Sequence, residues 1–140
     1  MPPWRHVPSL EQVHALGVDT AASHLGMQFT TIDERGISAS IPFDDRTFNS
    51  DRTLHVGALA ILAETIASVG ANLSVDQDRC YCLGQTLDVH HPAPIRGGPI
   101  TGRATQELDS GTRQVWRIEM RDGDASLVAI AYLTVAVIER

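Results

Sequence analysis

Several features are scarce in this sequence. Only two of its 140 residues are cysteines, Cys80 and Cys82, and its 17 acidic residues outnumber the 11 basic ones, which gives a formal net charge of −6. A chain without excess basic charge lacks the electrostatic patch that nucleic acids and anionic membranes attract. Two cysteines that are two positions apart make a strained bridge, so they indicate free thiols and not a disulfide framework. We therefore expect no nucleic acid or membrane partner.

The N-terminal residues also lack the apolar core with a basic flank that marks a secretory signal. Together with the free thiols, this predicts a cytoplasmic protein. The composition, 43% hydrophobic and 20% charged, is that of a globular protein, and 140 residues correspond to one domain of ordinary size. We find no repeat or linker, and so we expect a single domain over residues 1–140.

The first third of the chain predicts two short helices and a hairpin. Ser9 with Gln12 forms a capping-box pattern before apolar residues at helical spacing, which predicts a helix that stops at Gly17. A second short helix is expected between Asp19 and Gly26. Strands are expected over 27–33 and 37–43, followed by a polar loop over 44–53.

The most informative segment is 54–73, which holds about 20 mostly apolar residues and a single charged one, Glu64. A helix that is apolar on every face must be enclosed by other elements. Glu64, Ser68 and the glycines interrupt the segment too much for a membrane span, and no basic flank follows it. The segment therefore predicts a long helix in the core of a globular protein.

The rest of the chain alternates apolar and polar residues, with turn residues between the runs. This predicts four further strands, over 81–91, 100–108, 114–121 and 126–138. The sequence therefore predicts an α+β protein in which one antiparallel sheet curls around one long helix.

Glu64 is the strongest candidate for chemistry, because a carboxylate in the middle of an apolar helix is rarely buried without a partner or a function. Ser68, four residues further, lies on the same helical face and can donate a hydrogen bond to the carboxylate or to a nearby water. The alternative is a structural ion pair with an arginine such as Arg96 or Arg113. The residues alone leave both interpretations open.

His55 and Val56 precede Glu64 at the expected start of the helix, where free N–H groups and the helix dipole can stabilise a developing oxyanion. Gly57 permits close approach of a ligand. Eight helical residues separate Val56 from Glu64 by roughly 12 Å, so one chain does not bring both to the same atom. A shared site would need an antiparallel second copy, which predicts an active site at a dimer interface. For His55 alone, a helix-terminal hydrogen bond to the backbone is the simpler interpretation.

Other types of site are disfavoured. His90, His91 and the two cysteines match no zinc spacing, and adjacent strand residues point to opposite faces. The glycines near residue 97 lack the lysine and following helix of a phosphate loop, and there is no Gly-x-Ser-x-Gly motif. We expect no metal, no bound cofactor and no serine-hydrolase chemistry.

Two short motifs carry a resemblance that extends over nearly the whole chain. They are Leu54-His55-Val56-Gly57 and Leu62-Ala63-Glu64-Thr65. The chain resembles hot-dog-fold thioesterases of the phenylacetate-degradation type. In those enzymes the two motifs usually read Leu-His-Gly-Gly and Leu-Ala-Glu. Within that superfamily the chain is most similar to the 4-hydroxybenzoyl-CoA and 1,4-dihydroxy-2-naphthoyl-CoA thioesterases. The similarity also covers Asp45-Arg46-Thr47, His91-Pro92-Ala93-Pro94, the 114–119 strand and Leu133-Thr134-Val135-Ala136-Val137.

The resemblance implies a hot-dog fold, hydrolysis of an acyl-CoA thioester, and assembly as a homodimer or homotetramer. It implies that Glu64 is the nucleophile or general base, that Ser68 positions it or the water, and that the Val56 N–H holds the thioester oxygen beside His55. Asn49 stands where such enzymes often carry a glutamine that contacts the acyl site. The implied substrate-binding residues are Gly57, Ile61, His91, Thr112 and Arg113.

Two other functions remain open. Val56 replaces the first glycine of the Leu-His-Gly-Gly motif, so the chain could be a non-catalytic acyl-CoA-binding protein with a closed site. A hot-dog hydratase or dehydratase would use an Asp and His pair near the helix start, and His55 has no such aspartate beside it.

Overall fold

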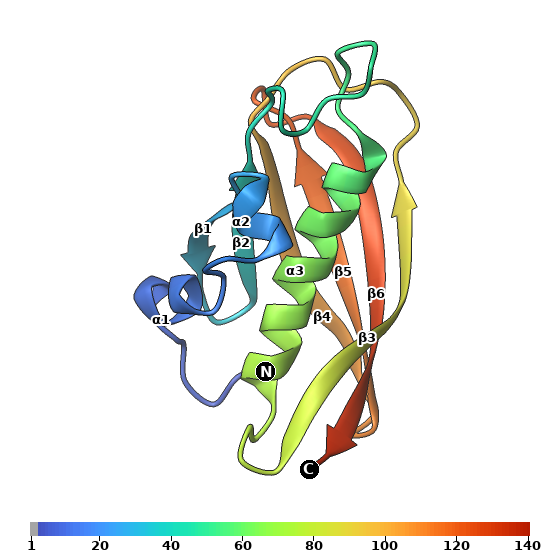
Figure 1. Ribbon diagram of the computed structural model, residues 1–140. Helices are drawn as coiled ribbons and strands as arrows, with labels where there is room; N and C mark the ends of the chain where they lie inside the picture. Colours follow the sequence, from blue (N-terminus) through green and yellow to red (C-terminus); the bar gives the residue numbers. More distant parts are fainter. Residues whose placement is uncertain (1–2) are drawn as a thin grey trace.

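Six antiparallel strands form one strongly curved sheet, in the order β1-β2-β4-β5-β6-β3. The computed structural model describes residues 3–140 (Figure 1). The strands are β1 (Gln28–Ile32), β2 (Gly36–Ile41), β3 (Cys80–His90), β4 (Ile100–Asp109), β5 (Arg113–Arg121) and β6 (Leu127–Glu139). The helices are α1 (Leu10–Ala15), α2 (Ala21–His24) and α3 (Val56–Ser74). The expected α+β architecture is confirmed, and strand and helix bounds lie within a few residues of those expected.

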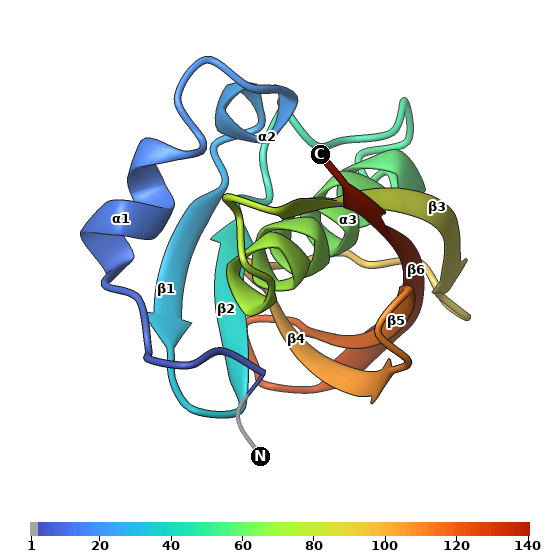
Figure 2. The same cartoon turned by 90° about the horizontal axis from the view of Figure 1, so that it is seen from below.

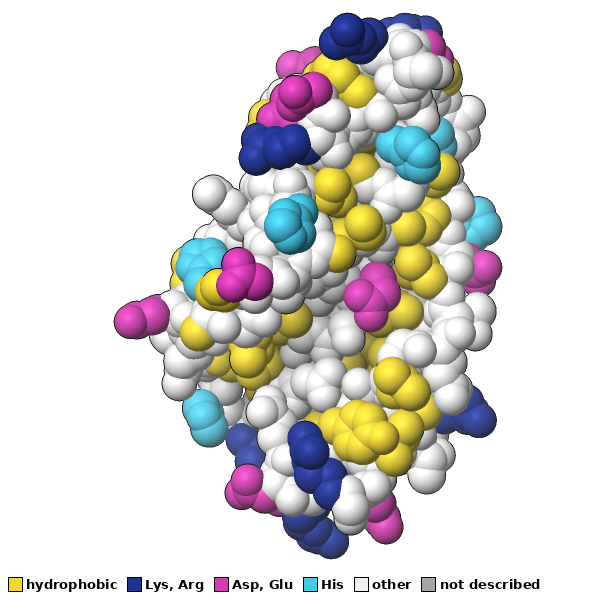
Figure 3. Space-filling model, in the orientation of Figure 1, with side chains coloured by type: hydrophobic (Ala, Val, Ile, Leu, Met, Phe, Trp, Pro, Cys, Tyr) yellow, Lys and Arg dark blue, Asp and Glu magenta, His cyan; other side chains and the backbone are white. Residues whose placement is uncertain are grey.

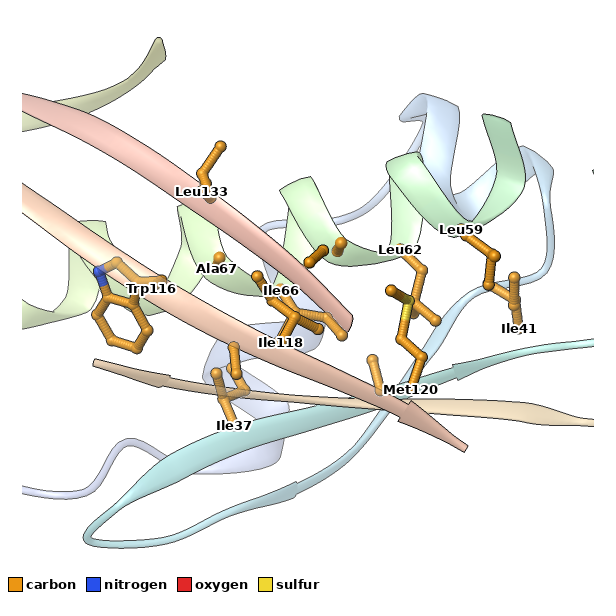
Figure 4. Packing of buried hydrophobic residues seen from close by; sticks show 14 of the residues in the cluster. Ile37, Ile41, Leu59, Leu62, Ile66, Ala67, Trp116, Ile118, Met120 and Leu133 are labelled. Atoms are coloured by element: carbon orange, nitrogen blue, oxygen red, sulfur yellow. The ribbon is translucent and has the colours of Figure 1, made fainter. Parts of the chain in front are cut away.

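α3 lies in the concave side of the sheet, and the strands curl around it (Figure 2). Its buried face holds Leu59, Leu62 and Ile66, which are fully buried. They point at sheet residues such as Ile118 and Met120 (Figure 4). By length and composition α3 could cross a membrane, but here it is the core helix of a sheet. This core fixes α3 relative to every strand except β1, and so it fixes the residues that α3 carries.

The opposite face of α3 is not enclosed within this chain. Its buried residues lie along one side, whereas Gly57, Ala60, Ile61, Glu64 and Ser68 are only partly buried. The expectation that other elements of the chain surround this helix is therefore wrong on this face. In Figure 3, hydrophobic and uncharged groups surround an acidic group in the middle of the face that carries α3, and basic groups lie toward its ends.

The short helices α1 and α2 stand beside β1, outside the sheet (Figure 2). Ser9 and Gln12 form the expected capping box at α1, and Thr20 forms a second one with Ser23 at α2. Both cysteines are free thiols, and the burial of Cys82 raises the pKa of its thiol to about 11.

Candidate active site

Glu64 lies half-buried on the open face of α3, against the edge strand β3. Its Oε1 reaches so close to Gly84 that a Cβ at that position would be 3.3 Å away. Among residues 3–140, no arginine or histidine comes within 4.0 Å of this carboxylate. Arg113, one of the candidate partners, donates instead to Gln85 Oε1 at 2.5 Å. The structural ion pair left open above is therefore not formed.

Two features of its surroundings shift the pKa of Glu64 in opposite directions. Burial raises the pKa of the carboxyl above its ordinary value, because a charge is poorly solvated there. A hydrogen bond from Ser68 works against this, since it stabilises the ionised form. This is the pairing expected from the four-residue spacing. A carboxylate with a raised pKa and a nearby donor is suited to accept a proton or attack a carbonyl carbon.

The start of α3 presents one open N–H group. His55 is the N-cap, and its Nδ1 accepts the Gly57 N–H at 2.7 Å. The Ala58 and Leu59 N–H groups both donate to the His55 carbonyl oxygen. Within residues 3–140 the Val56 N–H has no acceptor, so it is the donor available to a ligand oxygen. The helix-terminal hydrogen bond considered for His55 is present, and it selects Val56 over Gly57 as the donor.

Asn49 does not face a ligand site in this structure. Its Nδ2 donates to Thr53 Oγ1 at 3.0 Å and to the Leu54 carbonyl oxygen at 3.1 Å, so the amide is used inside its own loop. Asparagine is one methylene shorter than the glutamine of the resemblance, and this shortness lets it close the loop. Arg52, in the same loop, has a left-handed φ of 67°, a conformation that glycine adopts without cost.

The loop and α3 enclose a small cavity next to the open N–H. Its volume is about 280 Å³, and it reaches Gly57 and Ile61 on α3 as well as His55. Leu25 and Phe48 supply apolar walls, and Arg46 lies at its rim. The cavity is large enough for a small acyl group, and it opens beside the group that would hold a carbonyl oxygen.

The expected site residues fall into two groups. His55, Val56, Gly57, Ile61 and Asn49 gather at the start of α3, whereas Glu64 and Ser68 lie about two turns further along α3. Arg113 bonds to Gln85 of β3, and Thr112 precedes it in the β4–β5 turn, but Arg113 alternates with the buried Gln114 and so lies on the sheet face that points away from α3 and Glu64. His91 follows the far end of β3 and lines a separate cavity of about 500 Å³ with His90. One chain therefore does not bring all of these residues together.

Sequence reasoning missed Gly84, which makes room for the Glu64 carboxylate. The available signal was a glycine in the middle of a strand, a pattern that often marks the close approach of another group. It also missed Asn72, whose side chain bonds to β3 beside this point.

Comparison with known proteins adds an independent line of evidence. The family model described as "Thioesterase superfamily" matches residues 52–129. An esterase of Vibrio cholerae is 40% identical over 96% of this chain and 89% of its own length. The 1,4-dihydroxy-2-naphthoyl-CoA hydrolase of Escherichia coli is 31% identical over 96% of this chain and 98% of its own length.

A solved structure agrees with these sequence matches. The crystal structure of a mutant thioesterase from Pseudomonas aeruginosa superposes with a TM-score of 0.94 at 34% identity, covering 98% of this chain and 99% of that one. The match includes the sheet wrapped around one long helix. This chain belongs to the thioesterase superfamily, has the hot-dog fold, and is a thioester hydrolase by descent.

Proposed function

We propose that this chain hydrolyses an acyl-CoA thioester, with an aryl or medium-chain acyl group, to the free acid and CoA. Membership of the thioesterase superfamily supports the reaction type, and the name of the Escherichia coli relative supports CoA as the leaving group. The small cavity beside Gly57 supports an acyl group of modest size. The working form is a homodimer or homotetramer, because a single chain holds the two halves of the site apart. We place it in the cytoplasm.

In this mechanism the Val56 N–H of one subunit donates to the thioester carbonyl oxygen and stabilises the negative charge that develops there. Glu64 of the partner subunit then either attacks the carbonyl carbon or removes a proton from the attacking water. The C–S bond breaks, and the electron pair leaves with CoA as its thiolate. In the first route, water then hydrolyses the acyl-glutamate anhydride and returns the free carboxylate.

One observation carries this proposal. The open N–H and the half-buried carboxylate lie on the same helix, separated by eight residues or roughly 12 Å. A second copy of α3, antiparallel across a two-fold axis, brings each N–H to the carboxylate of the other copy. The uncovered face of α3 and the free edge of β3 are the surfaces available for that contact.

The remaining residues support these two groups. We propose that Ser68 keeps Glu64 ionised, that His55 fixes the helix start, and that Asn49 acts on the loop instead of on the acyl group. Gly57 and Ile61 would line the acyl cavity. We assign CoA contacts to His91, Thr112 and Arg113, because His91 directly follows β3, Arg113 bonds to Gln85 of β3 with Thr112 beside it, and each of the three is at least partly exposed.

Subunit complementation tests the shared site. Val56→Pro removes only the proposed donor, because proline is well tolerated at the first helical position. Glu64→Gln removes the carboxylate. Each variant alone should be inactive toward benzoyl-CoA and octanoyl-CoA. An equal mixture, unfolded and refolded together, should recover about a quarter of wild-type activity, since half of the dimers are mixed and each mixed dimer has one intact site.

Val56→Ala is the matched control, because it shortens the side chain and keeps the N–H. It should retain activity. If the mixture stays inactive while both variants fold and dimerise, Glu64 and Val56 do not meet across an interface. If Glu64→Gln alone turns over both thioesters at the wild-type rate, the carboxylate is not catalytic.

Non-catalytic binding of acyl-CoA is the second candidate. The Val56 side chain favours it. The residue is 44% exposed, and its isopropyl group lies beside its own N–H, where it narrows the approach of a carbonyl group to that donor. Calorimetric binding of the same two thioesters without release of CoA thiol by the wild-type chain would select this function over hydrolysis.

A further inference from the structure

Asn72 ties the end of α3 to the edge strand β3. Its Oδ1 accepts the Cys82 N–H at 2.8 Å, and its Nδ2 donates to the Cys82 carbonyl oxygen at 3.2 Å. The same Nδ2 also donates to the Ser68 carbonyl oxygen at 2.9 Å. One side chain thus bonds to both main-chain groups of a single strand residue. Because β3 is the last strand of the sheet, no neighbouring strand satisfies the groups on its free edge, and at Cys82 the Asn72 side chain takes that place.

This attachment lies next to Glu64. Glu64, Ser68 and Asn72 follow one another at four-residue spacing and so share one face of α3. Gly84, over which Glu64 Oε1 lies, is two residues from Cys82 and therefore on the same side of the strand. The Cys82 thiol adds a 3.4 Å bond to the Ala71 carbonyl oxygen, so the contact between helix and strand is closed at this point.

We propose that Asn72 is a positioning residue for Glu64, which acts by holding β3 against α3 so that Gly84 forms the floor under the carboxylate. Only the expected effect of Asn72 on catalysis rests on the proposed function. The position of Glu64 over Gly84 is a feature of the chain itself.

The proposal predicts how Glu64 responds when the attachment is lost. Without the Asn72 side chain, the Cys82 N–H and carbonyl groups form hydrogen bonds with water instead, and β3 moves away from α3. Glu64 then becomes better solvated, and its pKa falls toward the ordinary value. Only burial and the Ser68 hydrogen bond shift this pKa, and no charged group on α3, β3 or β6 contributes among residues 3–140. Better solvation should therefore lower this pKa, because burial is the largest cause of its shift.

The first test measures Glu64 directly. The carboxyl carbon of Glu64, assigned by its loss in Glu64→Gln, is titrated by NMR in the wild type and in Asn72→Ala. We expect the midpoint to fall by about half a pH unit in the variant. Asn72→Ser, which keeps one donor, should give a smaller shift and serves if the alanine variant does not fold. Gln77→Ala is the matched control, because Gln77 donates only to the Asn72 main-chain oxygen.

The second test measures catalysis with benzoyl-CoA. Asn72→Ala should lower kcat on the order of tenfold with KM changed by less than about threefold, because the carboxylate is misplaced while substrate contacts remain. An unchanged midpoint, or equal shifts in Asn72→Ala and Gln77→Ala, would refute the positioning role. If the wild type hydrolyses no thioester, the proposed function fails, and the titration still decides on Asn72.

Discussion

Glu64 combines a proposed catalytic role with an environment that disfavours its charge. Because burial raises its pKa, the folded chain binds more protons than the unfolded chain between the ordinary pKa and the raised one. Folding stability therefore falls as the pH rises through this interval, and above it the ionised carboxylate costs stability. The chain retains at this position an acid that its own packing disfavours, as is common at active sites.

Glu64→Gln should consequently stabilise the fold at neutral pH. Glutamine has nearly the same shape and carries no charge to desolvate, so the variant should have a higher Tm than the wild type at about pH 7. At about pH 4, where the carboxyl is largely protonated, the two Tm values should converge. Thermal unfolding followed by circular dichroism at both pH values checks this. A constant difference between the two chains would mean that titration of Glu64 is not the cause.

At the scale of elements, a buried polar chain joins the end of α3 to β5. Trp116 Nε1 donates to Gln114 Oε1 at 2.8 Å, and Gln114 Nε2 donates to Ser74 Oγ at 2.9 Å. Both Gln114 and Trp116 are almost completely buried. The indole of Trp4 stacks on that of Trp116, with the two ring centroids 6.4 Å apart, and covers this end of the core.

Gln114→Ala should lower the free energy of unfolding by about 2–3 kcal/mol, because it leaves the Trp116 N–H buried without an acceptor. Ser74→Ala removes both hydrogen bonds of the Ser74 hydroxyl, which accepts from Gln114 Nε2 and donates to the Ala71 carbonyl oxygen, and should cost about 1–2 kcal/mol. The double variant Gln114→Ala with Trp116→Phe should lose less than the sum of the two single losses, since no orphaned donor remains. Urea unfolding of the wild type, Gln114→Ala, Ser74→Ala, Trp116→Phe and the double variant makes the comparison, and strict additivity of the Gln114→Ala and Trp116→Phe losses would contradict the network.

The order of these elements was predictable because local signals set them. Alternation between Gln114 and Arg121 specifies a strand with one buried face, and β5 shows that alternation in its burial. The capping box at Ser9 specifies the start of α1. The apolar pattern of α3 did not predict its uncovered face, because such a pattern does not distinguish burial within one chain from burial between two. Only the separation of Val56 from Glu64 pointed to a second copy.

The site was predictable in part, for a similar reason. A lone carboxylate in an apolar helix and a serine four residues later identify Glu64 and Ser68. Their neighbours from other elements depend on register, so Gly84 beneath the carboxylate emerges only from the fold. The turn of Asn49 into its own loop depends on a difference of one methylene, which sequence patterns do not resolve.

At the scale of the whole molecule, the partly buried face of α3 has the character of an interface core. Its side chains are small or apolar around one acid, and β3 beside it has a free edge. Ala60 lies four residues from both Val56 and Glu64. A two-fold axis that joins these groups between chains must pass close to Ala60 of each chain.

Ala60→Arg should therefore convert the proposed dimer into monomers and abolish the proposed hydrolysis, since it sets two like charges face to face. Leu108→Arg is the matched control: Leu108 is 57% exposed and lies on β4 opposite Val115 of β5, on the sheet face that points away from α3. Sedimentation velocity and benzoyl-CoA turnover should show loss of both properties in the first variant and neither in the second. An active dimer of Ala60→Arg would require a different axis.

The hydrogen bonds at the His55 cap determine how well the start of α3 can bind the inorganic anions of a cell. Helix starts commonly bind phosphate or sulfate because several N–H groups converge on one ion. Here the imidazole and the His55 carbonyl already take three of those groups, and one remains. A lone donor suits a single carbonyl oxygen but offers little to a tetrahedral ion, so millimolar inorganic phosphate should be a poor competitor at this end of the helix.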